Sequence, residues 1–406
     1  MEKTDVLKKR RIYLAVGVFA MLFSGVLYAW SILKVPFAEV YLWSASALSF
    51  NFTLTMCFFC LGAFAGSLIL KKIGPCGSLI VSGALVGVGF VVTGLLNENL
   101  LSLLYVSYAI LAGSGIGISY NVVVSTVNAW FPDKKGLCSG CLMMGFGIST
   151  LLLGEIISKL FENPNVGFGK TYIILGVVIS VVIVVSGLIL KLPSKDETLP
   201  QAKEANGGKE KFETRDFTTV EMIKKFSFIK SFVAITFIAA VGNSVISFAR
   251  DLVISVNAAP SLATTLVGVL SIFNGVGRVL TGLIYDKIGR RFTMISANAL
   301  TIIAAGIALL AVSTSSLSLM IAGLCLTGIS YGSCPTVTSA FTSSFYGRKY
   351  FATNYSIANF NLIFASFIAN AANSLLSSTG GYSMPFIMLL VLSVVALFLN
   401  LSIKRP

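Results

Sequence analysis

One arginine follows a long stretch of apolar sequence. Residues 252–277 contain no charged side chain, Arg278 comes directly after them, and the next acidic residue is Asp286. An arginine inside a membrane costs at least ~2.5 kcal/mol, so it must face a cavity or a partner. Its guanidinium can hold a carboxylate through two parallel hydrogen bonds and stays charged at every physiological pH. Arg278 therefore predicts a binding site for a small carboxylate anion, with a structural ion pair as the alternative.

Three more polar side chains could complete such a site. Asn274 lies four residues before Arg278, on the same face of a helix, and could add a hydrogen bond. Tyr120 and Tyr331 each end a copy of the tetrapeptide Gly-Ile-Ser-Tyr. We expect them at similar depth on opposite walls of one cavity, where their phenols can donate hydrogen bonds to the anion. The alternative is that both tyrosines only pack between helices.

Two carboxyl groups could carry a proton together with the anion. Asp251 and Glu155 each lie about twenty residues into an apolar segment, which places them near one membrane surface. A desolvated carboxyl titrates closer to neutral pH, and the chain has no histidine to act as a proton relay. The alternative is that both acids only anchor their helices at the interface.

Other kinds of chemistry find little support in the sequence. The pairs Cys57/Cys60 and Cys138/Cys141 have the spacing of zinc ligands, but their places within apolar segments indicate small helix residues. The sequence contains no nucleotide-binding loop, catalytic triad or cluster of metal ligands. We therefore expect neither an enzyme nor a bound metal or cofactor.

Membrane-spanning helices must position these residues. Of the 406 residues, 56% are hydrophobic and only 11% are charged, against about 25% charged in soluble domains. A helix needs ~20 apolar residues to cross the hydrocarbon core. The charge-free stretches provide eight windows for one crossing each, and two longer windows, 292–347 and 350–403, for two crossings each. The sequence predicts an all-α protein of twelve transmembrane helices in the plasma or bacterial inner membrane.

The net charge of +14 indicates topology and not nucleic-acid binding. Short cytoplasmic loops retain lysine and arginine. With a cytoplasmic N-terminus and twelve crossings, all but five of the 30 basic residues fall on the cytoplasmic side. We expect both termini to be cytoplasmic and the basic loops to contact anionic membrane lipid. The five exceptions are Lys34, Lys159, Lys170, Arg250 and Arg278.

The chain also repeats itself. Lys72-Ile73-Gly74 recurs 215 residues later as Lys287-Ile288-Gly289. The repeat predicts two six-helix halves with pseudo-symmetry around a central cavity, residues 1–190 and 228–406. Residues 191–227 mix basic and acidic side chains with Asn206-Gly207-Gly208, which is typical of a solvated cytoplasmic linker. Helical spacing over residues 220–226 predicts a short helix on the membrane surface at the end of this linker.

Taken together, these features resemble the major facilitator superfamily. The loop signature of that superfamily, a glycine followed by Asp-Lys-x-Gly-Arg-Arg, occurs after Gly282 as Asp286, Lys287, Gly289, Arg290 and Arg291. Such a loop sets a carboxylate and a basic cluster at cytoplasmic helix ends, where they can favour a state closed to the inside. The corresponding loop of the first half has Lys71 in place of the acid, so a charge contact there must be built differently.

A narrower resemblance is carried by Phe273-Asn274-Gly275-Val276-Gly277-Arg278, by Tyr28-Ala29-Trp30 and by the loop 129–140. These segments are similar to the oxalate/formate antiporter branch and its monocarboxylate transporter relatives. It implies that Arg278 binds the substrate carboxylate and that Tyr120 and Tyr331 line the site. Oxalate carriers have a lysine in the eleventh span, where counting from Asn354-Tyr355 reaches Leu362, and this difference favours a monocarboxylate over a dianion. The first-span segment adds Tyr28 to the expected site, and the loop 129–140 adds Asp133 to the gating residues.

The sequence thus predicts a monomeric secondary active transporter of small organic carboxylates such as lactate, pyruvate or formate. Transport would proceed by alternating access, in symport with protons or in exchange for another anion. The alternatives are an oxalate or dicarboxylate antiporter and a drug or metabolite exporter of the same superfamily. An exporter of cationic drugs would need an unpaired carboxylate at mid-membrane, and neither Glu155 nor Asp251 is expected there.

Overall fold

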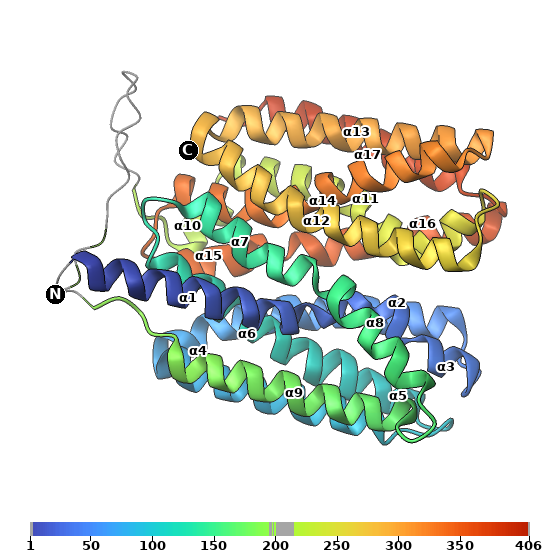
Figure 1. Cartoon of the computed structure of the whole chain (residues 1–406). Coiled ribbons are helices and arrows are strands. Elements are labelled where there is room, and N and C mark those ends of the chain that lie inside the picture. The colour runs from blue at the N-terminus through green and yellow to red at the C-terminus, as the bar shows by residue number, and fades with distance from the viewer. Residues whose placement is uncertain (1–2, 195–196, 198, 200–214, 405–406) are drawn as a thin grey trace.

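The computed structural model describes residues 3–194, 197, 199 and 215–404, and every regular element in this part of the chain is a helix. The long helices run side by side in one bundle, and the chain begins and ends at the same end of it (Figure 1). We call this end the termini side and the opposite end the distal side. Helices satisfy their own backbone hydrogen bonds, which is what an apolar surrounding requires.

Eleven segments of the described chain are long and apolar enough to cross a membrane. One of them, Ser46–Gly94, lies within helix α4 (Ala45–Gly94), which turns at Gly74. The 50 residues of α4 extend over ~75 Å of helix at 1.5 Å per residue, enough for two crossings of ~30 Å. With α4 counted twice, the segments give twelve crossings, and the predicted fold class is confirmed.

The first half contains crossings one to six. Helix α4 packs against both α6 and α9, at the lower side of Figure 1. Its elements are α1 (Lys3–Ser24), the short helices η1 (Gly25–Ala29), α2 (Trp30–Leu33) and α3 (Val35–Glu39), α4, α5 (Leu101–Leu104), the π-helix η2 (Tyr105–Ala112), α6 (Gly113–Ala129), α7 (Lys135–Gly147), α8 (Ser149–Glu162) and α9 (Gly167–Ile189).

The second half contains crossings seven to twelve. Here α14 packs against α12 and α13, and α11 packs against α16 and α17 (Figure 1, yellow to red). Its elements are α10 (Thr219–Ile223), α11 (Phe226–Ile254), α12 (Pro260–Ile288), α13 (Arg290–Thr314), α14 (Leu317–Tyr346), α15 (Phe351–Ala358), α16 (Asn361–Thr379) and α17 (Ser383–Leu401).

Two glycines of the sequence repeat share one backbone conformation. Gly74 has φ 68° and ψ −176°, and Gly289 has φ 90° and ψ −179°. Positive φ with extended ψ is a region that only glycine occupies readily. The repeated glycine therefore makes the same sharp reversal between the second and third crossings of each half.

The two halves meet through pseudo-symmetric pairs of helices. Helix α7, in the fifth crossing of the first half, packs against α12, the second crossing of the second half. In the reverse pairing, α15 and α16 pack against α4. The second crossing of each half thus contacts the fifth crossing of the other.

Of the predicted linker, residues 191–194, 197, 199 and 215–227 are described, and Asn206-Gly207-Gly208 lies outside the described residues. The expected helix over residues 220–226 is shorter: α10 ends at Ile223, and Lys225, with φ −83° and ψ 129°, separates it from α11. Thr218 and Glu221 form a capping box that starts α10.

Candidate anion-binding site between the two halves

The guanidinium of Arg278 is almost fully buried within α12, with 1% of the residue exposed. Its Nε donates a hydrogen bond to Oδ1 of Asn274 at 3.0 Å, and its Nη2 has no hydrogen-bond partner. Among the described residues, no acid forms an ion pair with Arg278. A buried charge that lacks a partner is costly, so the arrangement suits an anion bound at Nη2.

Tyr28 and Tyr331 lie next to this guanidinium and connect the two halves. The Cζ atom of Arg278 is 6.0 Å from the centre of the Tyr28 ring. The hydroxyl groups of Tyr28 in η1 and Tyr331 in α14 are 3.1 Å apart. Tyr331 also donates a hydrogen bond to Oδ1 of Asn243 in α11, at 2.7 Å. The structure therefore brings these two predicted tyrosines together with Arg278.

The other predicted tyrosine, Tyr120 in α6, forms a second bond between the halves. Its hydroxyl lies 2.8 Å from that of Tyr355 in α15, and the two rings are stacked. Phe146 makes edge contacts with both Tyr28 and Tyr120, so it joins the two tyrosine pairs. Arg278 interacts electrostatically with members of both pairs.

Two residues of this cluster were not predicted from the sequence. These are Tyr355 and Asn243. Both are buried polar side chains inside apolar spans, where polar groups are expensive and often functional. That cost is the signal by which the sequence could have revealed them.

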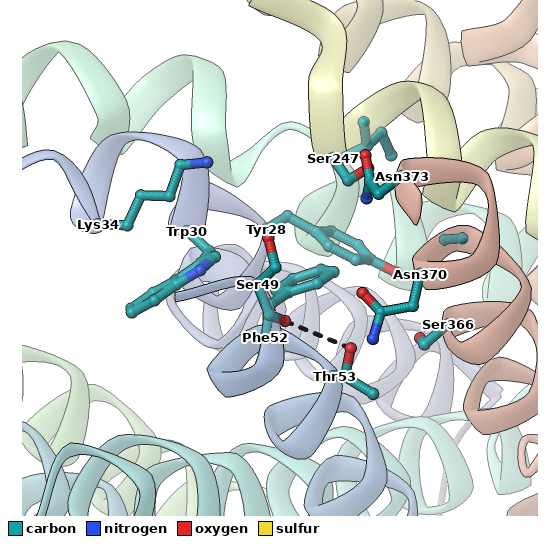
Figure 2. A pocket seen from close by; sticks show the side chains of 12 residues that line it. Tyr28, Trp30, Lys34, Ser49, Phe52, Thr53, Ser247, Ser366, Asn370 and Asn373 are labelled. Carbon is teal, nitrogen blue, oxygen red and sulfur yellow. Dashed lines mark hydrogen bonds between the residues drawn. The ribbon is translucent and has the colours of Figure 1, made fainter. Parts of the chain in front are cut away.

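A small cavity lies beside the cluster, and a larger one adjoins it, since Tyr28 and Ile246 line both. Tyr28, Gly147, Thr150, Ile246, Val267, Leu270, Ser271 and Asn274 line the smaller cavity. Tyr28, Trp30, Lys34, Ser49, Phe52, Thr53, Ile246, Ser247, Ser366, Ala369, Asn370 and Asn373 line the larger one (Figure 2).

The larger cavity lies toward the distal side. Its lining comes from the end of the first crossing, the start of α4, the end of α11 and the end of α16, and these helix ends lie away from both chain termini (Figure 1). Hydrogen bonds between the halves continue from the tyrosine pairs toward the termini side, through Asn121 with Ala352 and Arg348 with Pro132. The halves are therefore in contact on the termini side.

Asp286 makes the most specific of these contacts. Its carboxylate accepts hydrogen bonds from the backbone amides of Gly136, at 3.1 Å, and Leu137, at 2.9 Å, in the first turn of α7. A carboxylate at this position caps the helix and interacts favourably with its dipole. A Cβ atom on Gly282 would lie 2.3 Å from the carbonyl oxygen of Gly136, so the two backbones touch where Asp286 binds.

The other predicted gating residues lie elsewhere on the termini side. Arg290 donates to the carbonyl oxygen of Ile403 at 3.2 Å, within the second half. Lys287 and Arg291 are exposed. Asp133 pairs with Arg10 of its own half, whose guanidinium lies over the ring of Phe131.

The first half places Lys71 where the second half has Asp286. The Lys71 ammonium donates a hydrogen bond to Oγ1 of Thr353, at 2.8 Å, in the first turn of α15. The two contacts occupy related places in the pseudo-symmetric pairs of helices. They differ in charge, since Asp286 is an acid and Lys71 a base. The positive end of the helix dipole therefore attracts Asp286 and repels Lys71.

The two acids considered for proton coupling lie outside both cavities. Glu155 has 73% of its side chain exposed and pairs with Lys159 at 2.7 Å, one turn along α8. Asp251 is exposed near the end of α11. Leu362 is buried, with 8% exposed, and lines neither cavity.

A family model described as Major Facilitator Superfamily matches residues 12–248 and 232–406 of the chain. The oxalate:formate antiporter of Oxalobacter formigenes is 27% identical over 414 residues, which cover 97% of this chain and 91% of that protein. Monocarboxylate transporter 12 of Mus musculus is 23% identical over 277 residues, which cover 63% of this chain and 56% of that protein.

Two solved transporters share the fold. The fucose:proton symporter of Escherichia coli superposes with a TM-score of 0.68 at 11% identity, covering 98% of this chain and all of that one. A proton:xylose symporter superposes with a TM-score of 0.72 at 13% identity, covering 100% of this chain and 97% of that one.

Proposed function

The chain belongs to the major facilitator superfamily, and on that premise we propose that it carries small organic carboxylates across the membrane by alternating access. It is a multi-pass membrane protein of a transporter fold, and its relatives are transporters and not enzymes. We place the protein in the plasma or bacterial inner membrane as a monomer, in contact with anionic lipid and with both termini cytoplasmic.

The unpartnered Nη2 of the buried Arg278 is the observation that carries this proposal. A carboxylate at that atom supplies the missing hydrogen bond and the missing countercharge at once. Nearby phenols, Tyr28 and Tyr331 above all, can donate to its second oxygen. Because arginine keeps its proton, it releases the anion only when the geometry of the site changes.

The tyrosine pairs provide a way for the geometry to change. Tyr28 with Tyr331, and Tyr120 with Tyr355, each join one half to the other. Tilting one half against the other would separate both pairs, and a bound anion gives the freed hydroxyls an acceptor. With cytoplasmic termini, the contact between the halves closes the protein toward the cytoplasm, where the Asp286 carboxylate caps α7.

Within this class we favour a monocarboxylate, because Leu362 holds the place of the eleventh-span lysine of oxalate carriers. Coupling would be by proton symport, with Asp251 or Glu155 as the proton carrier, or by anion exchange. An oxalate or dicarboxylate antiporter is the second candidate, supported by the 27% identity to the oxalate:formate antiporter over 97% of the chain.

Uptake into proteoliposomes tests the proposal. Purified protein would be supplied with labelled formate, lactate, pyruvate and oxalate, with and without a pH gradient and with and without anion inside. We expect saturable uptake of a monocarboxylate that oxalate inhibits weakly. Strong oxalate exchange would establish the second candidate, and absence of any carboxylate uptake would overturn both.

A further inference from the structure

Asn243 in α11 is a buried polar side chain that contacts the anion site through one of its phenols. It is 2% exposed. Its Oδ1 accepts a hydrogen bond from the Tyr331 hydroxyl at 2.7 Å, and its Nδ2 donates to Oγ of Ser366 in α16 at 3.4 Å. An amide inside an apolar span is costly and often functional. Asn243 thus joins α16 to the Tyr331 phenol beside Arg278.

The hydroxyl of Ser366 fixes which way round the Asn243 amide lies. Ser366 donates its one proton to the carbonyl oxygen of Leu362, at 2.8 Å, so its oxygen can only accept a hydrogen bond from Asn243. The NH2 group of Asn243 therefore faces Ser366, and its carbonyl oxygen faces Tyr331. In the reversed orientation the amide oxygen would face Ser366 without a donor, and a buried acceptor left in this way is unfavourable.

This orientation sets the direction of a hydrogen bond between the two halves. A phenol has one proton, and Tyr331 gives its proton to Asn243. The hydroxyl groups of Tyr28 and Tyr331 are 3.1 Å apart, so the bond between them must use the proton of Tyr28. Tyr28 is therefore the donor of this pair, and Tyr331 is the acceptor.

The two phenols also differ in how firmly they are held. A Cβ atom on Gly242 would lie 2.2 Å from Cδ2 of Tyr331, so the Tyr331 ring packs directly on the α11 backbone next to Asn243. Tyr28 is only half-buried, and its ring reaches from the first half toward Asn370 and Ser366 of α16 (Figure 2). Tyr331 is thus fixed by both ring and hydroxyl, whereas Tyr28 has room to change partner.

We propose that Asn243 is a positioning residue that commits the Tyr331 proton and thereby makes Tyr28 the phenol that donates to the carboxylate. This inference rests on the proposed function, because it concerns the same anion at Arg278. The carboxylate competes with Tyr331 for the Tyr28 proton. When Tyr28 donates to the anion, its bond to Tyr331 is lost. Binding therefore removes one of the hydrogen bonds that join the halves.

A double-mutant cycle on lactate affinity tests this role. Lactate is titrated calorimetrically into purified wild type, Tyr28→Phe, Asn243→Leu and the double variant. In the wild-type background, Tyr28→Phe removes a hydrogen bond to a charged group, and lactate affinity should fall about tenfold or more. Asn243→Leu frees the Tyr331 proton for the anion. Adding Tyr28→Phe to that variant should therefore lower the affinity by less than about threefold.

An asparagine that only supports the fold would leave the effect of Tyr28→Phe the same in both backgrounds. Equal factors in the wild type and in Asn243→Leu therefore overturn the proposal, while carboxylate binding and the proposed function remain. Asn298→Leu is the matched control, because Asn298 is also buried and donates to the carbonyl oxygen of Ser393 in the second half. Tyr28→Phe should keep its full effect in the Asn298→Leu background.

Infrared spectroscopy of the ligand-free protein measures the same bond without lactate and without a variant at Asn243. The C–O stretching band of a tyrosine distinguishes a phenol that donates from one that only accepts. In protein with ring-labelled tyrosine, the band that Tyr28→Phe removes is that of Tyr28, and we expect it in the donor range. A Tyr28 band in the acceptor range overturns the proposal. If the wild type binds no lactate, the proposed function fails, and this band still decides the direction that Asn243 imposes.

Discussion

Nε of Arg278 donates to Oδ1 of Asn274 one helical turn away, at 3.0 Å. This bond fixes one edge of the guanidinium and leaves Nη2 without a partner inside the protein. One amide thus orients the charge without neutralising it. That relationship leaves Arg278 available to a ligand.

Replacing the charge should abolish transport while sparing the fold. Arg278→Gln removes a charge-assisted hydrogen bond worth about 1.5–3 kcal/mol, so carboxylate affinity should fall by roughly ten- to a hundredfold or more. Thermal stability should not decrease, because a buried unpaired charge is removed. Arg278→Lys should recover little activity, since an ammonium lacks the two-pronged geometry. Lactate uptake and the Tm, with Lys159→Gln as the control, check this. Full uptake by Arg278→Gln would contradict the site.

The tyrosine pairs should differ in their effect on stability. Tyr331→Phe loses the bond to Tyr28 and leaves the buried Oδ1 of Asn243 without this donor. The expected cost is about 1–3 kcal/mol, with weaker lactate binding. Tyr355→Phe loses the bond to Tyr120 and should cost less. Thermal unfolding and lactate titration measure both variants.

The matched control for this series is Tyr13→Phe, because Tyr13 packs edge-on against Trp130 away from the cluster. It should leave lactate binding unchanged. Equal losses of lactate binding in Tyr13→Phe and Tyr331→Phe would show that the effect is not specific to the tyrosine cluster. That result would contradict a role of the cluster in binding the anion.

Asp286→Asn should loosen contact between the halves on the termini side. The capping carboxylate on α7 is worth about 1 kcal/mol, so the open fraction should rise roughly fivefold. Cys138 in α7 is 1% exposed and serves as the probe. Its alkylation, followed peptide by peptide with mass spectrometry, should accelerate by the same factor. Glu155→Gln on the distal side is the control, and an unchanged Cys138 rate would exclude Asp286 as a latch.

Lys71→Glu should have the opposite effect. It places an acid near the first turn of α15, where Lys71 now contacts Thr353. A carboxylate near a helix N-terminus contributes about 0.3–1 kcal/mol, so alkylation of Cys138 should slow by roughly two- to fivefold. Lys72→Glu, the neighbouring exposed position, controls for the change of charge. Faster alkylation in Lys71→Glu would argue against a pseudo-symmetric gate.

Proton coupling should depend on Asp251 and not on Glu155, because Glu155 is already paired with Lys159. If symport operates, Asp251→Asn should make lactate uptake independent of the pH gradient while sparing exchange. Glu155→Gln should behave like the wild type. Uptake that requires internal anion and ignores the pH gradient would establish an antiporter, with both acids as anchors of their helices.

The sequence by itself determined the twelve crossings and singled out Arg278 as the charge on which the candidate site is centred. A hydrocarbon layer of fixed thickness demands about twenty apolar residues for each helix, so the spans can be counted from the charges. The same layer makes a charge such as Arg278 too costly to lie there without a purpose. The sequence also showed the glycine that recurs at positions 74 and 289, and both copies have the positive φ that glycine adopts readily.

Only the tertiary structure decided which side chains meet. Tyr120 and Tyr355 are 235 residues apart in the chain, and no spacing predicts their bond. Likewise, the sequence placed Glu155 near a membrane surface but did not show that it faces away from the cavities toward Lys159. Nor did it show that Lys71 reaches Thr353. The physical reason is that lipid and protein interior are both apolar, so hydropathy reveals a crossing but not its rotation or its neighbours.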